Sequence, residues 1–169
     1  MTIAFDAMLF AREVHAGQQR KYTGNPYADH LGEVAGIVAA SNYCGDVWHD
    51  LAVATAWLHD CVEDQGVTNV DLITRFGLTV AGGVMALSDL EVGNRAGRKA
   101  ASRARLAAAP NWVQSIKCAD LISNTSSIVR HDPVFAVTYL EEKRLLLDVM
   151  TKADPRLLAL ARAQIGGAA

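Results

Sequence analysis

Proline is scarce in this chain: 169 residues contain only four. Alternating runs of polar and apolar residues, the pattern typical of half-buried strands, are also rare. Apolar residues at helical spacing, by contrast, recur along the whole sequence. Because proline interrupts helices and alternation indicates strands, both shortages favour an all-α fold.

Cysteine is also sparse, and the number of cysteines is odd. Cys44, Cys61 and Cys118 are far apart in the sequence. This spacing indicates free thiols in a reducing compartment rather than a disulfide framework.

Signals for export, membrane insertion or nucleic-acid binding are missing. The first residues include Asp6, Arg12 and Glu13, which interrupt any apolar export segment. No apolar run looks long enough to cross a bilayer. The net charge of -2 gives no general attraction to nucleic acid or to an anionic membrane. We therefore expect a cytoplasmic protein without nucleic-acid or membrane partners.

The helical spacing predicts a single compact bundle over residues 1–169, with C-terminal helices at 134–165 packing on it. On the first helix, Phe5, Met8 and Leu9 should form part of a buried stripe. Thr68 or Asn69 should cap a short helix that closes at Gly77. The expected helices are 3–16, 31–41, 50–60, 67–77, 78–89, 95–108, 113–129, 134–152 and 156–165.

The segment "WLHDCVEDQG", residues 57–66, brings four ionisable side chains close together. His59 and Asp60 end an apolar helix, and both could ligate a metal ion if that end faces a cavity. Alternatively, they form an ordinary helix C-terminus with a favourable cation and a solvated acid. Glu63 and Asp64 follow one turn later if the helix continues.

Two other segments favour the metal interpretation. "GNPYADH" ends in His30 after a proline turn. "IKCADLISN" places Asp120 on an otherwise apolar helix, where a carboxylate needs a partner or a cation. Asn124 and Ser127 lie on the same helical face as Asp120.

His30, His59, Asp60 and Asp120 would together offer two nitrogens and two oxygens to one divalent ion. That donor set favours Mn²⁺, Fe²⁺ or Zn²⁺ over Mg²⁺. A bound ion would activate water and offset charge on a phosphoryl oxygen. Glu63 and Asp64 could then act as a general base, as a proton shuttle or as anchors of the ligands.

Four segments in this order resemble the hydrolase domain of RelA/SpoT homologues, a branch of the HD hydrolases, and most of all the small alarmone hydrolases. The resemblance extends from about Phe5 to Ile128. The segments are "HAGQQRKYTGNPYADH", "AWLHDCVEDQGVT", "FGLTVAGGVMALSD" and "IKCADLISNTSSI".

The resemblance implies hydrolysis of the 3′-pyrophosphate of (p)ppGpp to GDP or GTP with one Mn²⁺ per chain. His30, His59, Asp60 and Asp120 match the family's metal ligands, and Glu63 and Asp64 match its catalytic acids. Arg20 and Lys21 match the basic pair that packs on the base, and Asn124 matches a residue that contacts the nucleoside.

The sequence departs from the family at two positions. Leu31 stands where proline commonly follows the first ligand histidine, and Ser126 stands where a basic residue is common. Loss of an arginine removes a bidentate donor and a stacking plane, so an adenine alarmone is an alternative to the guanine one.

The basic stretch 95–105 contains Arg98 and Lys99, which form either a phosphate clamp or a solvated helix face. Other functions remain open: a phosphodiesterase or nucleotidase for a different phosphate ester, or a non-catalytic nucleotide sensor.

Overall fold

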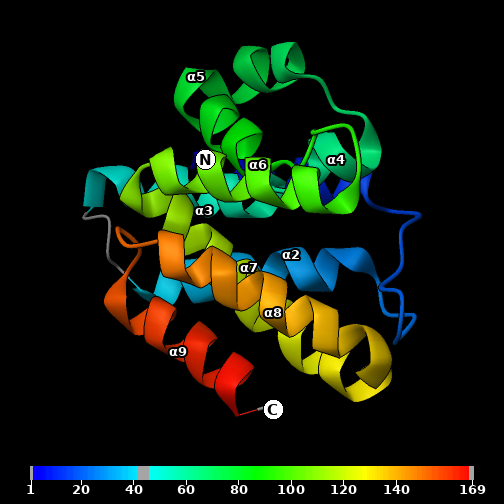
Figure 1. Cartoon of the computed structure of the whole chain (residues 1–169). Helices are drawn as coiled ribbons and strands as arrows, with labels where there is room; N and C mark the ends of the chain where they lie inside the picture. Colours follow the sequence, from blue (N-terminus) through cyan, green and yellow to red (C-terminus); the bar gives the residue numbers. More distant parts are fainter. Residues whose placement is uncertain (1, 42–45, 168–169) are drawn as a thin grey trace. The chain divides into compact units, whose positions relative to one another are not determined.

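The computed structural model describes residues 2–41 and 46–167, and these residues fold into nine helices (Figure 1). Their only β-pairing is an isolated antiparallel bridge between Gln19 and Pro26. The all-α prediction is confirmed. Cys44 lies outside the described residues. The helices are α1 (Ile3–Val14), α2 (Tyr27–Ser41), α3 (Asp46–Leu58), α4 (Cys61–Gln65), α5 (Asn69–Leu87), α6 (Arg95–Ala108), α7 (Asn111–His131), α8 (Pro133–Val149) and α9 (Pro155–Gly166).

The chain divides into two compact units, Met1–Leu90 and Glu91–Ala169. The first unit contains α1 to α5 and the second α6 to α9. A single domain over residues 1–169 stays a prediction. In the second unit, α8 and α9 contact α7. Packing of residues 134–165 on the rest of the chain stays a prediction.

In the first unit, α3 packs against α1, α2 and α5. Its small residues Ala54 and Ala56 are fully buried, which lets the neighbouring backbones approach closely. On α2, a Cβ at Gly32 would lie 3.2 Å from the Trp57 ring, so glycine is needed there unless the ring moves. Trp57 packs against the hydrophobic core, as the sequence predicted.

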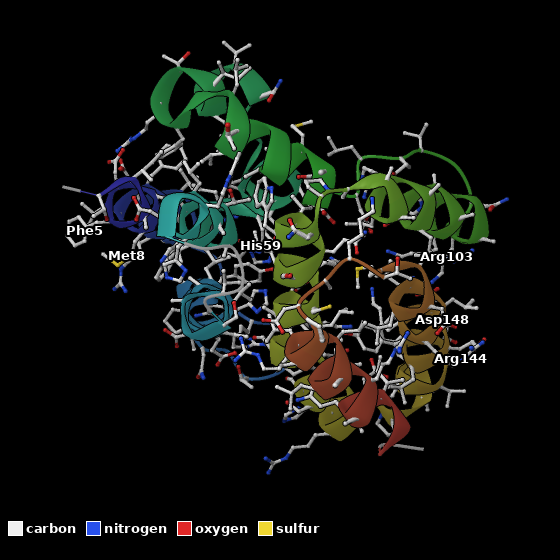
Figure 2. All side chains as sticks on the ribbon, turned by 90° about the vertical axis from the view of Figure 1, so that its left-hand side faces the viewer. Phe5, Met8, His59, Arg103, Arg144 and Asp148 are labelled. Carbon is white, nitrogen blue, oxygen red and sulfur yellow. The ribbon has the colours of Figure 1, made fainter. Side chains whose placement is uncertain are left out.

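The prediction that Phe5, Met8 and Leu9 form part of a buried stripe on α1 is wrong. Phe5 and Leu9 are each 46% exposed, and Figure 2 shows Phe5 pointing away from the neighbouring helices of its unit. Ala7 and Ala11 are the fully buried residues of α1. The reason is that α1 packs on the alanine-rich α3, where only small side chains fit the contact.

Helix α5 begins at a capping box: Thr68 Oγ1 accepts from the Asp71 N–H, and the Asp71 carboxylate accepts from the Thr68 N–H. The predicted Thr68 cap is confirmed. As predicted, a first helical stretch closes at Gly77, whose φ of 83° and ψ of 168° are not helical, and a second stretch follows it across a kink within α5. Length and composition alone would let α5 cross a membrane, which the sequence analysis did not foresee. A core helix passes the same test, and Leu72 and Val80 of α5 are fully buried.

In the second unit, α7, α8 and α9 lie side by side (Figures 1 and 2). The fully buried Gln114 on α7 accepts from the Lys152 N–H at 2.8 Å and donates to the Leu106 carbonyl at 2.9 Å. Ser115 Oγ accepts from the Asp154 N–H at 2.8 Å. These bonds tie the end of α6 and the turn between α8 and α9 to α7.

A pair of glycine substitutions in α5 tests the kink. Gly77→Ala should destabilise the protein by roughly 1–3 kcal/mol, because positive φ with ψ near 180° is a region that only glycine adopts readily. Gly82→Ala, in helical backbone with open space for a Cβ, should stabilise it by about 0.5–1 kcal/mol. Denaturant titration of both variants measures the two signs. Equal effects at the two positions would contradict the strained conformation at Gly77.

Candidate functional site

The loop between α1 and α2 has a fixed shape. His15 caps the end of α1, and its N–H bonds to the Ala11 carbonyl at 3.0 Å. Two backbone bonds then close the loop, from the Tyr27 N–H to the Gln18 carbonyl at 2.9 Å and from the Arg20 N–H to the Asn25 carbonyl at 2.8 Å. This loop therefore delivers the side chains of His15, Gln18 and Tyr27 to fixed places in the first unit.

His59 and Asp60 form the junction between α3 and α4. The helix that His59 and Asp60 were expected to end stops just before them, since α3 ends at Leu58 and α4 begins at Cys61. The one-turn spacing survives for Asp60 and Asp64, because the Asp64 N–H bonds to the Asp60 carbonyl at 2.9 Å. The break turns the His59 and Asp60 side chains toward His30 of α2.

His30, His59 and Asp60 form a group that could hold a metal ion, since one ligand atom from each lies within 4.8 Å of the others. Both histidines are nearly fully buried. Asp60 Oδ2 lies 3.0 Å from His59 Nε2 and 3.6 Å from His30 Nε2. The structure thus brings together three of the four predicted ligands (Figure 2 labels His59).

The hydrogen bonding of His59 fits metal binding. Its Nδ1 lies 2.8 Å from the Ala56 carbonyl oxygen, which only accepts, so Nδ1 carries the proton. A neutral ring then has its lone pair on Nε2, facing the Asp60 carboxylate. Two electron-rich atoms at that distance need a positive charge beside them, either a second ring proton or a bound cation. A backbone carbonyl behind the ring is the usual way to orient a metal-binding histidine.

Tyr27 is a site residue that the sequence analysis missed. Its hydroxyl donates to Asp60 Oδ2 at 2.6 Å. His15, the C-cap of α1, is a second residue of this neighbourhood that the sequence did not assign to the site. Its ring is 1% exposed and stacks on the Tyr27 ring at 5.3 Å. The only sequence signal was their place in the first segment of the family resemblance.

Each of the two predicted catalytic acids accepts a hydrogen bond from outside α4. Glu63 Oε2 accepts from the Asp89 N–H at 2.9 Å. Asp64 Oδ2 accepts from Gln18 Nε2 at 2.8 Å. Both acids are exposed, and they follow the metal-ligand group directly in the chain.

Asp120 belongs to the second unit, where it is 6% exposed on α7. It is paired, as a buried carboxylate requires: Lys117 Nζ lies 2.7 Å from Oδ2, and Asn124 Nδ2 donates to Oδ1 at 2.7 Å. The predicted polar face therefore includes Asp120 and Asn124 in direct contact. Ser127 lies half-buried further along α7. Metal ligation by Asp120 and nucleotide contact by Asn124 and Ser127 stay predictions.

The predicted base-contacting pair lies in the loop between α1 and α2. Arg20 forms an ion pair with Glu33 of α2 at 3.1 Å. Lys21 Nζ donates to the Tyr22 hydroxyl at 3.3 Å and lies 4.9 Å from the centre of that ring. Both cations are on the loop that leads into Tyr27, and their role in binding stays a prediction.

The basic stretch 95–105 is partly neutralised within the second unit. Arg95 donates to both carboxylate oxygens of Glu142, at 2.6 and 2.9 Å, and Arg105 pairs with Glu91. Arg98 is exposed and Lys99 half-buried on the same helix. A phosphate clamp would thus depend on the middle of α6 rather than on its ends, and it stays a prediction.

Two thiols next to predicted ligands are unsuited to metal binding. Burial, with a smaller contribution from Asp60, raises the pKa of Cys61 to about 12. Burial, with a smaller contribution from Asp154, raises the pKa of Cys118 to about 12. Since only the thiolate is a good ligand, both buried cysteines fill core volume, and both are free thiols, as their spacing predicted.

Comparison with known proteins finds similarity over most of the chain. The model of the HD domain family matches residues 7–116. The chain is 30% identical over 132 residues to the guanosine-3′,5′-bis(diphosphate) 3′-pyrophosphohydrolase MESH1 of Danio rerio, covering 78% of this chain and 72% of that protein.

Larger bacterial proteins share shorter segments. A GTP pyrophosphokinase of Myxococcus xanthus is 41% identical over 76 residues, or 44% of this chain and 9% of that protein. A guanosine-3′,5′-bis(diphosphate) 3′-pyrophosphohydrolase of Haemophilus influenzae is 39% identical over 83 residues, or 49% of this chain and 11% of that protein. The match thus spans about a tenth of these two relatives.

Two solved structures share the fold. A metazoan SpoT orthologue described as hydrolysing ppGpp aligns with a TM-score of 0.87 and 21% identity, covering 99% of this chain and 96% of that one. A crystal structure from Listeria monocytogenes aligns with a TM-score of 0.68 and 22% identity, covering 85% of this chain and 96% of that one.

The hydrogen bond from Tyr27 to Asp60 gives a prediction about metal affinity. Tyr27→Phe keeps the ring and its stacking on His15 but removes the donor that orients the carboxylate. We expect Mn²⁺ affinity to fall by roughly 10–100-fold, as for other lost partners of metal ligands. Isothermal titration with Mn²⁺ measures it. Tyr22→Phe, which removes a hydroxyl from the same loop, is the control, and equal affinities in the two variants would contradict the assignment.

Proposed function

We propose that this chain, which belongs to the HD-domain family, hydrolyses the 3′-pyrophosphate of a nucleotide alarmone such as (p)ppGpp. Within that family it belongs with the guanosine-3′,5′-bis(diphosphate) 3′-pyrophosphohydrolase MESH1. The products would be pyrophosphate and GDP or GTP. One structural observation carries the proposal: two buried imidazoles meet a carboxylate, and two acids follow within four residues.

His30, His59 and Asp60 would hold a divalent ion; their nitrogen and oxygen donors suit Mn²⁺, Fe²⁺ or Zn²⁺, and the family resemblance implies Mn²⁺. When bound, such an ion makes water more acidic and offsets negative charge on phosphoryl oxygens. The backbone carbonyl behind His59 and the hydroxyl of Tyr27 keep the ligand atoms in place.

Glu63 and Asp64 would handle the proton of the attacking water. A carboxylate can accept that proton as a general base and return it to the ribose 3′-oxygen, which leaves as the 3′-hydroxyl of the nucleotide while the water oxygen enters the pyrophosphate. Both acids are solvent-exposed, so protons can exchange with bulk water. Each also accepts a hydrogen bond, from Asp89 or Gln18, which limits the orientations of its carboxylate.

Arg20 and Lys21 would bind the nucleotide base, as their counterparts in the family do. The chain carries Ser126 where a basic residue is common, so both guanine and adenine alarmones are substrates to test.

The direct experiment incubates the protein with ppGpp, pppGpp or ppApp and Mn²⁺ and identifies the products by mass. Pyrophosphate with a 5′-phosphorylated nucleoside supports the proposal. Turnover of other phosphate esters alone would favour a phosphodiesterase, and binding without turnover would favour a sensor.

Glu63→Gln separates proton transfer from metal binding. The amide keeps the shape of the side chain and can still accept from the Asp89 N–H, but it cannot take up a proton. We expect kcat to fall by roughly 10²–10⁴-fold, the usual contribution of a general acid–base, while Mn²⁺ binding is retained. Steady-state kinetics and Mn²⁺ titration measure the two effects.

Glu13→Gln, at an exposed glutamate on α1, is the matched control and should behave like the unmodified protein. Near-normal turnover of Glu63→Gln would remove Glu63 from the chemistry. Loss of Mn²⁺ binding together with turnover would move Glu63 to the ligand group.

A further inference from the structure

The side chain of Gln18 connects the loop between α1 and α2 to α4 through three hydrogen bonds. Gln18 Oε1 lies 2.6 Å from His15 Nδ1 and accepts from Gln65 Nε2 at 2.5 Å. Gln18 Nε2 donates to Asp64 Oδ2 at 2.8 Å. Only one orientation of the amide satisfies all three contacts, because a carboxylate accepts and an amide nitrogen donates.

The buried end of this chain of bonds is rigid. The His15 ring is 1% exposed and stacks on Tyr27 with an angle of 17° between the ring planes. Since Gln18 Oε1 only accepts, His15 must carry a proton on Nδ1. Burial lowers the pKa of His15, which favours the neutral ring with that single proton. Gln18 is therefore bonded to a group that cannot easily move.

At the other end of these hydrogen bonds, the Asp64 carboxylate needs an anchor to hold its orientation. Asp64 is exposed on α4, a helix of five residues that ends at Gly66 in left-handed backbone. Because Asp64 is exposed, the hydrogen bond from Gln18 is a contact that can fix the rotamer of its carboxylate. Catalytic groups lose efficiency steeply when they leave their working position.

We infer that Gln18 is a positioning residue that holds the Asp64 carboxylate in its working orientation for hydrolysis. It acts through Asp64 and does not itself touch the reacting atoms. The inference depends on the proposed function, since the orientation of Asp64 matters to turnover only if Asp64 takes part in the reaction.

Gln18→Glu is the sharpest test. A glutamate at this position still offers an acceptor to His15 and Gln65, but it replaces the donor with a negative oxygen facing Asp64. We expect kcat to fall by about 10–100-fold, the scale of loss for a displaced catalytic group, with KM changed much less. Thermal denaturation monitors folding. Gln19→Ala, at the exposed neighbouring glutamine, is the control and should leave kcat unchanged.

The same substitution in an Asp64→Asn background separates positioning from general support of the fold. The amide introduced by Asp64→Asn can donate to the new glutamate, and there is no carboxylate left to misplace. If Gln18 acts through Asp64, Gln18→Glu should cause no further fall in kcat in this background. A fall by the same factor in both backgrounds would overturn the inference.

The outcomes distinguish this inference from the proposed function. Near-normal turnover of Asp64→Asn alone would remove Asp64 from the reaction, and the inference would fall with it. A slow Asp64→Asn variant beside a Gln18→Glu variant with unchanged kcat would overturn the role of Gln18 while leaving the function of Asp64 intact.

Discussion

The candidate site depends on the contacts of one group, the Asp60 carboxylate. A single oxygen, Oδ2, lies 2.6 Å from the Tyr27 hydroxyl, 3.0 Å from His59 Nε2 and 3.6 Å from His30 Nε2. These partners come from the start of α2 and from the turn after α3. Each of them faces a partly buried negative charge, which is costly without compensation. The first unit therefore gathers one carboxylate and two imidazoles at a place where a cation is the natural complement.

The packing of α3 makes this concentration possible. Its buried alanines let α1 and α2 approach closely, and the contact between Gly32 and Trp57 shows how little space remains between α2 and α3. After Leu58, His59 and Asp60 form the short junction to α4, and Asp60 keeps right-handed helical backbone angles there. Tight packing fixes the positions of the helices, while this junction supplies two of the side chains that meet His30.

The sequence predicted what local patterns encode. Helical spacing predicted the all-α fold and the Thr68 cap, and residue chemistry predicted the group of His30, His59 and Asp60. The sequence did not reveal contacts between residues that are far apart in the chain. Gln18 and Asp64 are 46 positions apart, and Tyr27 and Asp60 are 33 apart, so no periodicity reveals their bonds. The exposure of Phe5 was also missed, because its surroundings depend on which face of α1 meets α3.

Asp60 and Asp120 show two different ways of balancing a shielded carboxylate. Asp60 accepts from the Tyr27 hydroxyl and faces the imidazoles of His30 and His59, so a divalent ion would supply a permanent positive charge that these three side chains do not carry. Asp120 has a permanent ammonium at 2.7 Å and an amide donor at 2.7 Å within its own helix. Any ion that reaches Asp120 must compete with Lys117, and the exchange replaces one cation by another. Before any ion binds, Lys117 already offsets much of the desolvation cost that an unpaired buried carboxylate would carry.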